Sequence, residues 1–363
     1  MLPKPAENKL VSPFFVFYII HAMQVGVGIL GFERYISKVA GEDSWVSIIL
    51  SGISIHVLVW LSYKILNRGQ NDIFVIHRDV LGKWAGGFIS FYLICYITIF
   101  AIIILRSYVE VIQVWMFPDL HAWYLTMILL VLVYYAVIGG FRVIVGLCFL
   151  GVIYSLPLLL LKAFPLKEAH FSNLLPIFDH SVLDLIKGGK IMTFNFLGFE
   201  TLFFFYPFIK KPESSHKWAQ LGVLSTTLIY VITALVSFVY FSQEQLFHTV
   251  WPTLSLWQTV NLPFIQRFEY AGLSIWLFVV LPNICLMTWA ASRGIKQMTS
   301  IKQKHSLVFI LLITFIACTI LSDRGEIDMI STWINRLGFY TIYFYIPFLF
   351  FFQKFRDRPG QTT

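Results

Sequence analysis

A polar run interrupts an apolar segment near the middle of the chain. It contains an amide (Asn195), a glycine (Gly198) and a carboxyl group (Glu200) among phenylalanines. Glu200 is ten residues from Lys190 and ten from Lys210, so in a helix it lies about 15 Å from either charged end, close to the midplane of a bilayer. A carboxylate there costs at least about 2.5 kcal/mol to insert. We therefore expect Glu200 to face other helices and to have a partner or a proton.

A second irregular segment lies near the start of the chain, where Gly26, Gly28 and Gly31 fall within six residues. Each glycine costs a helix about 1 kcal/mol relative to alanine. The spacing matches the dinucleotide-binding pattern GxGxxG, but that fingerprint needs a strand before it and a helix after it. Here an apolar helix precedes the glycines. We therefore predict a broken membrane helix and no nucleotide site.

The two interruptions stand in corresponding places, because Gly26 and Gly198 are 172 residues apart in a chain of 363. Matched breaks predict an inverted repeat with a ligand site at the midplane, where both helices unwind. Unwound backbone is tolerated in hydrocarbon only where it lines a cavity, and half-helix N-termini there favour an anionic group such as a carboxylate. The alternative is that the glycines serve close helix packing and that Glu200 makes a structural hydrogen bond.

The composition requires a bilayer as the solvent, because 58% of the residues are hydrophobic and only 13% are charged. We predict an all-α integral membrane protein, residues 1–363 forming one domain, with repeats at about 12–162 and 187–353. Its ten membrane-spanning helices, each long enough to cross about 30 Å of hydrocarbon, are expected near 12–32, 45–66, 86–116, 121–139, 143–162, 187–209, 218–241, 266–292, 306–321 and 337–353.

The loops give the orientation. With ten spans and a cytoplasmic N-terminus, seventeen of the 27 Lys and Arg residues fall on the inner side, which places both termini in the cytoplasm. The loop after the second span mixes charged and apolar residues and predicts a short interfacial helix. Residues 164–189 and 242–269 are long outer segments rich in Pro, Trp and His. They suit either aromatic anchoring at the interface or a lid or partner surface.

Several classes of function are not indicated. The net charge of +8 comes from short loops and not from a basic folded surface, so no nucleic-acid partner is expected. The cysteines lie within predicted spans without a CxxC pair, so we expect neither disulfides nor a metal site. Hydrolase, kinase and metalloprotease motifs are missing from the sequence. We expect no enzyme and no cofactor.

Other intramembrane residues are weaker candidates. Tyr96 and Phe100 are four apart and share a helix face, as pocket-wall residues or core residues would. Arg106 and Glu110 have the same spacing and suggest an ion pair at the rim of the cavity. Asn283 follows a proline within the eighth span and could present its amide to the cavity.

Four segments resemble one family. The pieces, in order, are SPFFVFYIIHAMQVGVGIL, LRSYVEVI, NLLPIF followed by LIKGG, and FLGFET. They are similar to the B subunit of spore germinant receptors, the GerAB family of the amino acid/polyamine/organocation transporter superfamily. The resemblance implies ten spans in a LeuT-like 5+5 inverted repeat with broken helices 1 and 6.

The resemblance also implies a non-enzymatic receptor subunit in the inner membrane of a bacterial endospore. Its partners would be a larger membrane A subunit and a lipoprotein C subunit, and its ligand a small germinant such as an amino acid, nucleoside or sugar. The implied ligand-binding residues are Gly26, Gly28, Ile29, Tyr96, Phe100, Asn195, Gly198, Phe199, Glu200, Thr201, Asn283 and Thr288. A proton- or sodium-coupled amino acid transporter of the same fold, with Glu200 as the proton carrier, remains an alternative. A scaffold with a vestigial cavity is a third hypothesis.

Overall fold

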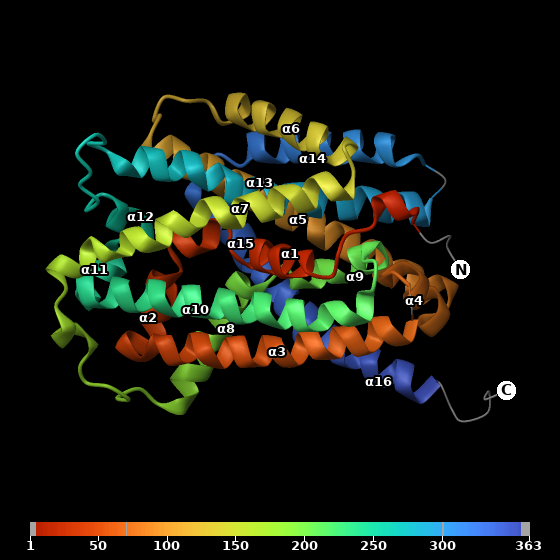
Figure 1. Ribbon diagram of the computed structural model, residues 1–363, viewed down its shortest axis with the longest axis horizontal. Coiled ribbons are helices and arrows are strands. Elements are labelled where there is room, and N and C mark those ends of the chain that lie inside the picture. Colours follow the sequence, from red (N-terminus) through yellow and green to blue (C-terminus); the bar gives the residue numbers. More distant parts are fainter. Residues whose placement is uncertain (1–4, 70, 300, 357–363) are drawn as a thin grey trace.

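The computed structural model describes residues 5–69, 71–299 and 301–356, which form helices and loops without a β-strand (Figure 1). The α-helices of the first half are α1 (Phe15–Gln24), α2 (Phe32–Ala40), α3 (Ser44–Gly69), α4 (Ile73–Leu81), α5 (Lys83–Trp115), α6 (Ala122–Ile138) and α7 (Phe141–Leu160). Those of the second half are α8 (Val182–Phe196), α9 (Leu202–Phe205), α10 (His216–Tyr240), α11 (Gln243–His248), α12 (Pro252–Trp257), α13 (Phe268–Met298), α14 (Gln303–Ile320), α15 (Arg324–Tyr340) and α16 (Ile346–Arg356).

The helices account for the ten predicted spans. Six helical segments in the described ranges are individually long and apolar enough to cross a membrane, and the bent pair formed by α8 with residues 199–208 brings the number to seven. One of the six runs from α2 through α3. The remaining spans are the short helices α1 and α6 and the interrupted pair of α15 with α16. In the loop after α3, the predicted interfacial helix is present as α4.

Both expected breaks are present. Helix α1 ends at Gln24, and a 3₁₀ turn, η2 (Val27–Leu30), separates it from α2. Helix α8 ends at Phe196, and the chain bends by 46° before it continues through η7 (Phe199–Thr201) and α9. Gly198 has φ +110°, a left-handed conformation that costs other L-residues about 1–2 kcal/mol. The sixth span is therefore broken at a residue whose backbone conformation only glycine adopts without strain.

The two halves pack against each other in corresponding pairs. The broken α1 lies on α10 and the broken α8 lies on α3, so each broken span contacts the second span of the other half. In the same way α7 packs on α13 and α15 packs on α5. Such reciprocal contacts between the two halves are expected for two inverted groups of five helices. The described residues that precede α1 and the end of α16 lie toward one end of the molecule, and α11 and α12 lie toward the other (Figure 1).

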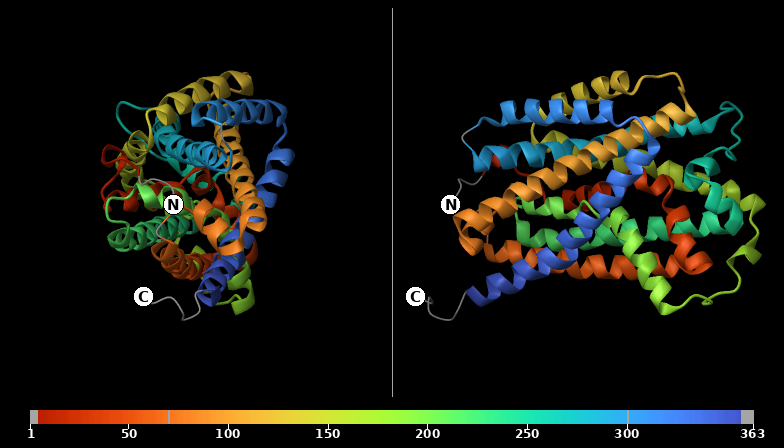
Figure 2. Two further views of the ribbon diagram at one scale, coloured as in Figure 1. Left: turned by 90° about the vertical axis from the view of Figure 1, so that its right-hand side faces the viewer. Right: turned by 180° about the vertical axis from the view of Figure 1, so that it is seen from behind.

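The last span differs from the prediction. It was expected at 337–353, but α15 begins at Arg324 and continues through a π-helical turn, η10 (Thr341–Tyr345), into α16. Figure 2 shows this element crossing the bundle diagonally. The first turns of α15 carry charged and hydroxyl side chains, so hydropathy alone placed its start thirteen residues too late.

Candidate functional site

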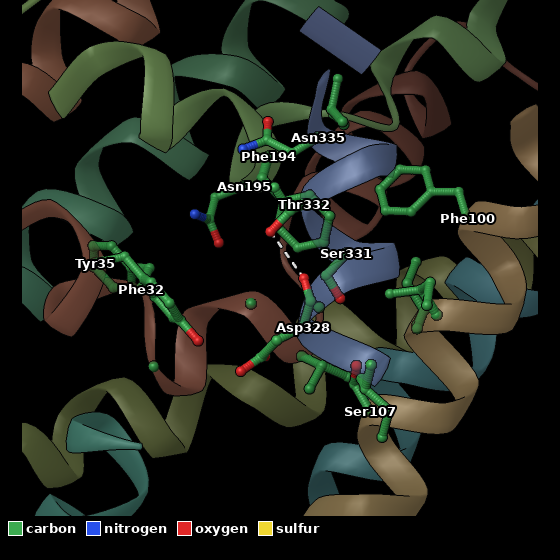
Figure 3. Close-up of a pocket in the computed structure, with 18 of the residues that line it drawn as sticks. Phe32, Tyr35, Phe100, Ser107, Phe194, Asn195, Asp328, Ser331, Thr332 and Asn335 are labelled. Atoms are coloured by element: carbon green, nitrogen blue, oxygen red, sulfur yellow. Dashed lines mark hydrogen bonds between the residues drawn. The ribbon is translucent and has the colours of Figure 1, made fainter. Parts of the chain in front are cut away.

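A cavity of about 270 Å³ lies where the two broken spans meet. Its wall comes from α1, η2, α2, α5, α8, α10, α13 and α15, with Val250 and Trp251 from the segment between α11 and α12. Figure 3 shows Asn195 and the polar face of α15 directed toward this space. Tyr35 of α2 and Asp328 of α15, which are exposed, mark its open end. The start of α15 lies at the opposite end of the molecule from the end of α16 (Figure 2). The size and the aromatic lining suit a small metabolite.

The glycines of the first break bring other elements close to the backbone. A Cβ atom on Gly26 would stand 2.7 Å from Asn283 Nδ2, and one on Gly28 would collide with Asn195 Oδ1. A Cβ on Gly31 would be 2.6 Å from the carbonyl oxygen of Val250. Each glycine therefore permits a different wall of the cavity to approach the unwound segment.

Amide side chains supply the polar part of the wall. The side-chain oxygens of four of them have no hydrogen-bond partner in the described structure: Gln24, Asn195, Asn283 and Asn335. Gln24 Nε2 donates to the carbonyl of Phe196 at 3.1 Å, and Asn283 Nδ2 donates to that of Val25 at 3.4 Å. Because a carbonyl only accepts, these nitrogens must face it and the amide oxygens must point elsewhere. Buried acceptors of this kind favour a ligand that carries N–H or O–H donors.

Glu200 has the partners that its depth in the membrane requires. Its Oε1 accepts from the Tyr96 hydroxyl and its Oε2 accepts from the backbone N–H of Gly198, both at 2.7 Å. Thr201 Oγ1 donates to the Gly198 carbonyl at 2.6 Å. Glu200 is buried, and its hydrogen bond with the backbone of Gly198 stabilises the break. Glu200 borders a separate cavity of about 10 Å³ and does not line the larger one.

The charged residues at the rim of the cavity do not pair as predicted. Glu110 lines the cavity, but its partner is Arg324 of α15, whose Nη1 lies 2.8 Å from Glu110 Oε1. Arg324 also lies 3.5 Å from Asp328 and stacks over the ring of Trp251. The predicted partner, Arg106, donates instead to the carbonyl of Leu321 at 2.6 Å. The expected intrahelical pair is therefore wrong, because the arginine turns to the adjacent loop.

The predicted ligand-binding residues fall into two groups. Those that line the larger cavity are Gly26, Gly28, Phe100, Asn195 and Asn283. Those that are buried behind its wall are Ile29, Tyr96, Gly198, Phe199, Glu200, Thr201 and Thr288. Direct contact between any of them and a ligand stays a prediction. Of the shared face proposed for α5, only Phe100 reaches the cavity, because Tyr96 turns to Glu200.

Sequence reasoning missed the contribution of α15. The lining residues of this helix with polar side chains are Arg324, Asp328, Ser331, Thr332 and Asn335. They are spaced at intervals of three and four, so they share one helical face. Within this face Thr332 Oγ1 donates to the Asp328 carbonyl at 2.8 Å, the dashed line in Figure 3. The polar periodicity is visible in the sequence and was the signal available.

Comparison with solved structures supports the architecture. The fold is similar to that of a Na⁺-coupled sialic acid symporter in a substrate-bound, outward-open state, with a TM-score of 0.67 over 94% of this chain and 80% of that chain. The two sequences are 12% identical, so the likeness concerns the fold.

Comparison with sequences gives the family. Spore germination protein GerQB of Bacillus cereus is 43% identical over 96% of this chain and 97% of its own length. Spore germination protein A2 of Bacillus subtilis (strain 168) is 23% identical over 92% of each chain. The family model described as spore germination protein matches residues 10–327. The chain is therefore a multi-pass membrane protein that belongs to the spore germination protein family.

Proposed function

We propose that this chain is the germinant-sensing subunit of a spore germination receptor and that it binds a small molecule in the cavity between its broken helices. The observation that carries the proposal is the set of unpaired amide oxygens, from Gln24, Asn195, Asn283 and Asn335, around a space formed by both breaks. Leaving such groups unpaired costs about 1–3 kcal/mol each, so a ligand that pairs them gains affinity. Amino acids, nucleosides and sugars all carry suitable donors.

The proposed signal is a shift between two conformations. A ligand moves such an equilibrium only by its differential affinity for the two states. The cavity suits this mechanism because Asn335 and Ser331 belong to α15, whereas Gln24 and Asn195 belong to the ends of α1 and α8. A ligand that pairs both sets draws α15 toward the breaks, and partner subunits sense the change.

The proposed setting is the inner membrane of the endospore, together with a larger membrane A subunit and a lipoprotein C subunit. The excess of Lys and Arg in alternate loops supports cytoplasmic termini. The residues that precede α1 lie toward the same end of the molecule as the end of α16, so this orientation directs the open end of the cavity away from the cytoplasm (Figure 2).

A glycine pair tests the proposal in spores. In Gly28→Ala the new Cβ collides with Asn195, whereas in the control Gly146→Ala it meets nothing within 4 Å. We expect spores with Gly28→Ala to lose most of their response to the germinant at a normal protein level, and those with Gly146→Ala to respond like the parent. An unchanged dose response in Gly28→Ala spores contradicts the site.

Transport is the second candidate function, and the buried carboxyl group of Glu200 beside the break is the observation that favours it. Vesicles that contain the isolated protein distinguish the two. Saturable binding without net uptake of labelled germinant supports sensing, and uptake that depends on a proton or sodium gradient supports a transporter.

A further inference from the structure

The ionised side chains that line the larger cavity lie in one cluster, which reaches the open end at Asp328. They are Glu110 of α5 with Arg324 and Asp328 of α15, so two carboxylates face one guanidinium. Arg324 Nη1 lies 2.8 Å from Glu110 Oε1, and Arg324 Nε lies 3.5 Å from Asp328 Oδ2. Among the described residues no lysine or histidine contributes to the lining. The cation of this wall is therefore already paired with acids of the chain itself.

Arg324 is not free to receive a carboxylate from a ligand. Its guanidinium also lies over the ring of Trp251, 4.8 Å from the ring centroid. A ligand acid that bonded to Arg324 would compete with Glu110, which is buried. Taking the partner from a buried charge is strongly destabilising. Binding of an acid at this position thus carries a cost that an uncharged ligand avoids.

The sixth span supplies its own carboxyl group at the break. Half-helix N-termini in broken membrane helices point at anionic groups of a ligand. Here the backbone N–H of Gly198 already donates to Oε2 of Glu200 at 2.7 Å, and Glu200 is buried. The oxygen fills this position whether the carboxyl group is ionised or protonated. The donor that a ligand carboxylate would use at this break is therefore occupied.

The groups that remain for a ligand are neutral. Ser107 and Ser331 contribute hydroxyls to the lining and Asn195 contributes an amide, and Figure 3 shows all three around the cavity. Phe100 and Phe194 add apolar ring surface. Hydroxyls and amides both donate and accept hydrogen bonds, so they suit O–H and N–H groups. They do not compensate a buried carboxylate or phosphate, because buried charges need a partner of opposite charge.

We infer that the ligand of this cavity carries no carboxylate or phosphate group and is recognised through hydroxyl or N–H groups together with an apolar face. The inference rests on the proposed function, because it concerns the ligand of the same site. The excess of negative charge in the cluster acts in the same direction, since it repels an acidic compound at the entrance and leaves an uncharged one unaffected. Sugars, polyols and nucleosides belong to this class, whereas free amino acids and nucleotides do not.

Matched pairs of compounds test this class. Both members of a pair share one frame, and only the second carries the acid: glucose with glucuronate, adenosine with adenosine monophosphate, and L-valinol with L-valine. Calorimetry measures their binding to the full-length chain in lipid nanodiscs. We expect at least one first member to bind saturably and its acidic partner to bind at least about tenfold more weakly, which corresponds to about 1.4 kcal/mol.

Asp328→Asn separates the effect of charge from that of shape. The substitution keeps the size of the side chain and removes one of the two acids beside Arg324. We expect it to reduce the discrimination against the acidic member by about two- to fivefold, the range for one partly exposed ion pair. The control is Glu326→Gln, which removes the same charge from an exposed position of α15 outside the cavity lining.

The outcomes separate this inference from the proposed function. Preference for the uncharged member, reduced in Asp328→Asn and kept in Glu326→Gln, supports the inference. An acidic member that binds as tightly as its uncharged partner overturns it and leaves the cavity as a binding site, so the proposed function stands. Equal discrimination in Asp328→Asn and the parent protein overturns the electrostatic argument. Absence of saturable binding by all six compounds contradicts the proposed function together with the inference.

Discussion

The side-chain amide of Gln24 donates to the backbone carbonyl of Phe196 and so joins the two half-helices at their broken ends. The residues are 172 apart, the same separation as Gly26 and Gly198. The bond satisfies a carbonyl left free at the end of α8 and fixes the orientation of the Gln24 amide. One contact thus joins the two breaks and orients an amide whose oxygen is unpaired.

Removing that contact has a predictable cost. In Gln24→Leu the carbonyl of Phe196 loses its donor while the side-chain volume is nearly kept, so we expect the free energy of unfolding to fall by about 1–3 kcal/mol. A thermal melt of the purified protein measures the change, with the exposed Gln258→Leu as the control. Equal melting temperatures for both variants would show that the bond does not stabilise the fold.

Gly198 tests the second break. Alanine there meets a left-handed backbone and a Cβ position 2.5 Å from the Met23 carbonyl oxygen, whereas Gly140 has φ +90° with nothing within 4 Å. Gly140→Ala therefore carries only the backbone cost of about 1–2 kcal/mol. We expect Gly198→Ala to accumulate at a clearly lower level in membranes than Gly140→Ala. Similar levels would mean that close approach to α1 is unimportant.

The sequence was informative about the breaks and less so about their contacts. Glycines among apolar residues located Gly26 and Gly198, because an interrupted apolar run is a local signal. The partner of Glu200 could not be predicted, because Tyr96 is 104 residues away and local spacing carries no information about such a contact. Helical spacing paired Glu110 with Arg106 and missed Arg324, because spacing identifies only neighbours on the same helix. The start of α15 was not predicted, because a helix that faces a cavity is too polar for hydropathy to detect.

The ion pair of Glu110 with Arg324, which replaces the predicted pair of Glu110 with Arg106, can be tested by mutation. Glu110 is buried and lies 2.8 Å from Arg324, so a double-mutant cycle of Glu110→Gln with Arg324→Gln should give a coupling of about 0.5–3 kcal/mol in unfolding free energy. The same cycle with Arg106→Gln should give a smaller coupling, because Arg106 donates its hydrogen bonds to Leu321 and Gln113. Stronger coupling of Glu110 to Arg106 would restore the intrahelical pair.

The Glu200 site predicts a similar contrast. Tyr96→Phe removes the donor to Glu200 and should cost about 1–3 kcal/mol. This cost should shrink when Glu200→Gln is already present, because the two residues share one interaction. Tyr108→Phe removes a buried hydroxyl on the same helix that donates to Leu273, and its cost should be independent of Glu200. Calorimetry or chemical denaturation provides the values.

The most direct test of the proposed binding site is ligand protection of a single thiol in the cavity, introduced into a chain whose four native cysteines are replaced by alanine. Ser331→Cys places it on the wall formed by α15, and Thr319→Cys, exposed and outside the cavity, is the control. A thiol reagent is applied to the purified protein with each of a panel of amino acids, nucleosides and sugars. We predict that the compound that triggers germination of spores carrying this chain slows labelling at position 331 and leaves position 319 unchanged. Unchanged labelling at 331 with that compound at a triggering concentration would contradict the account.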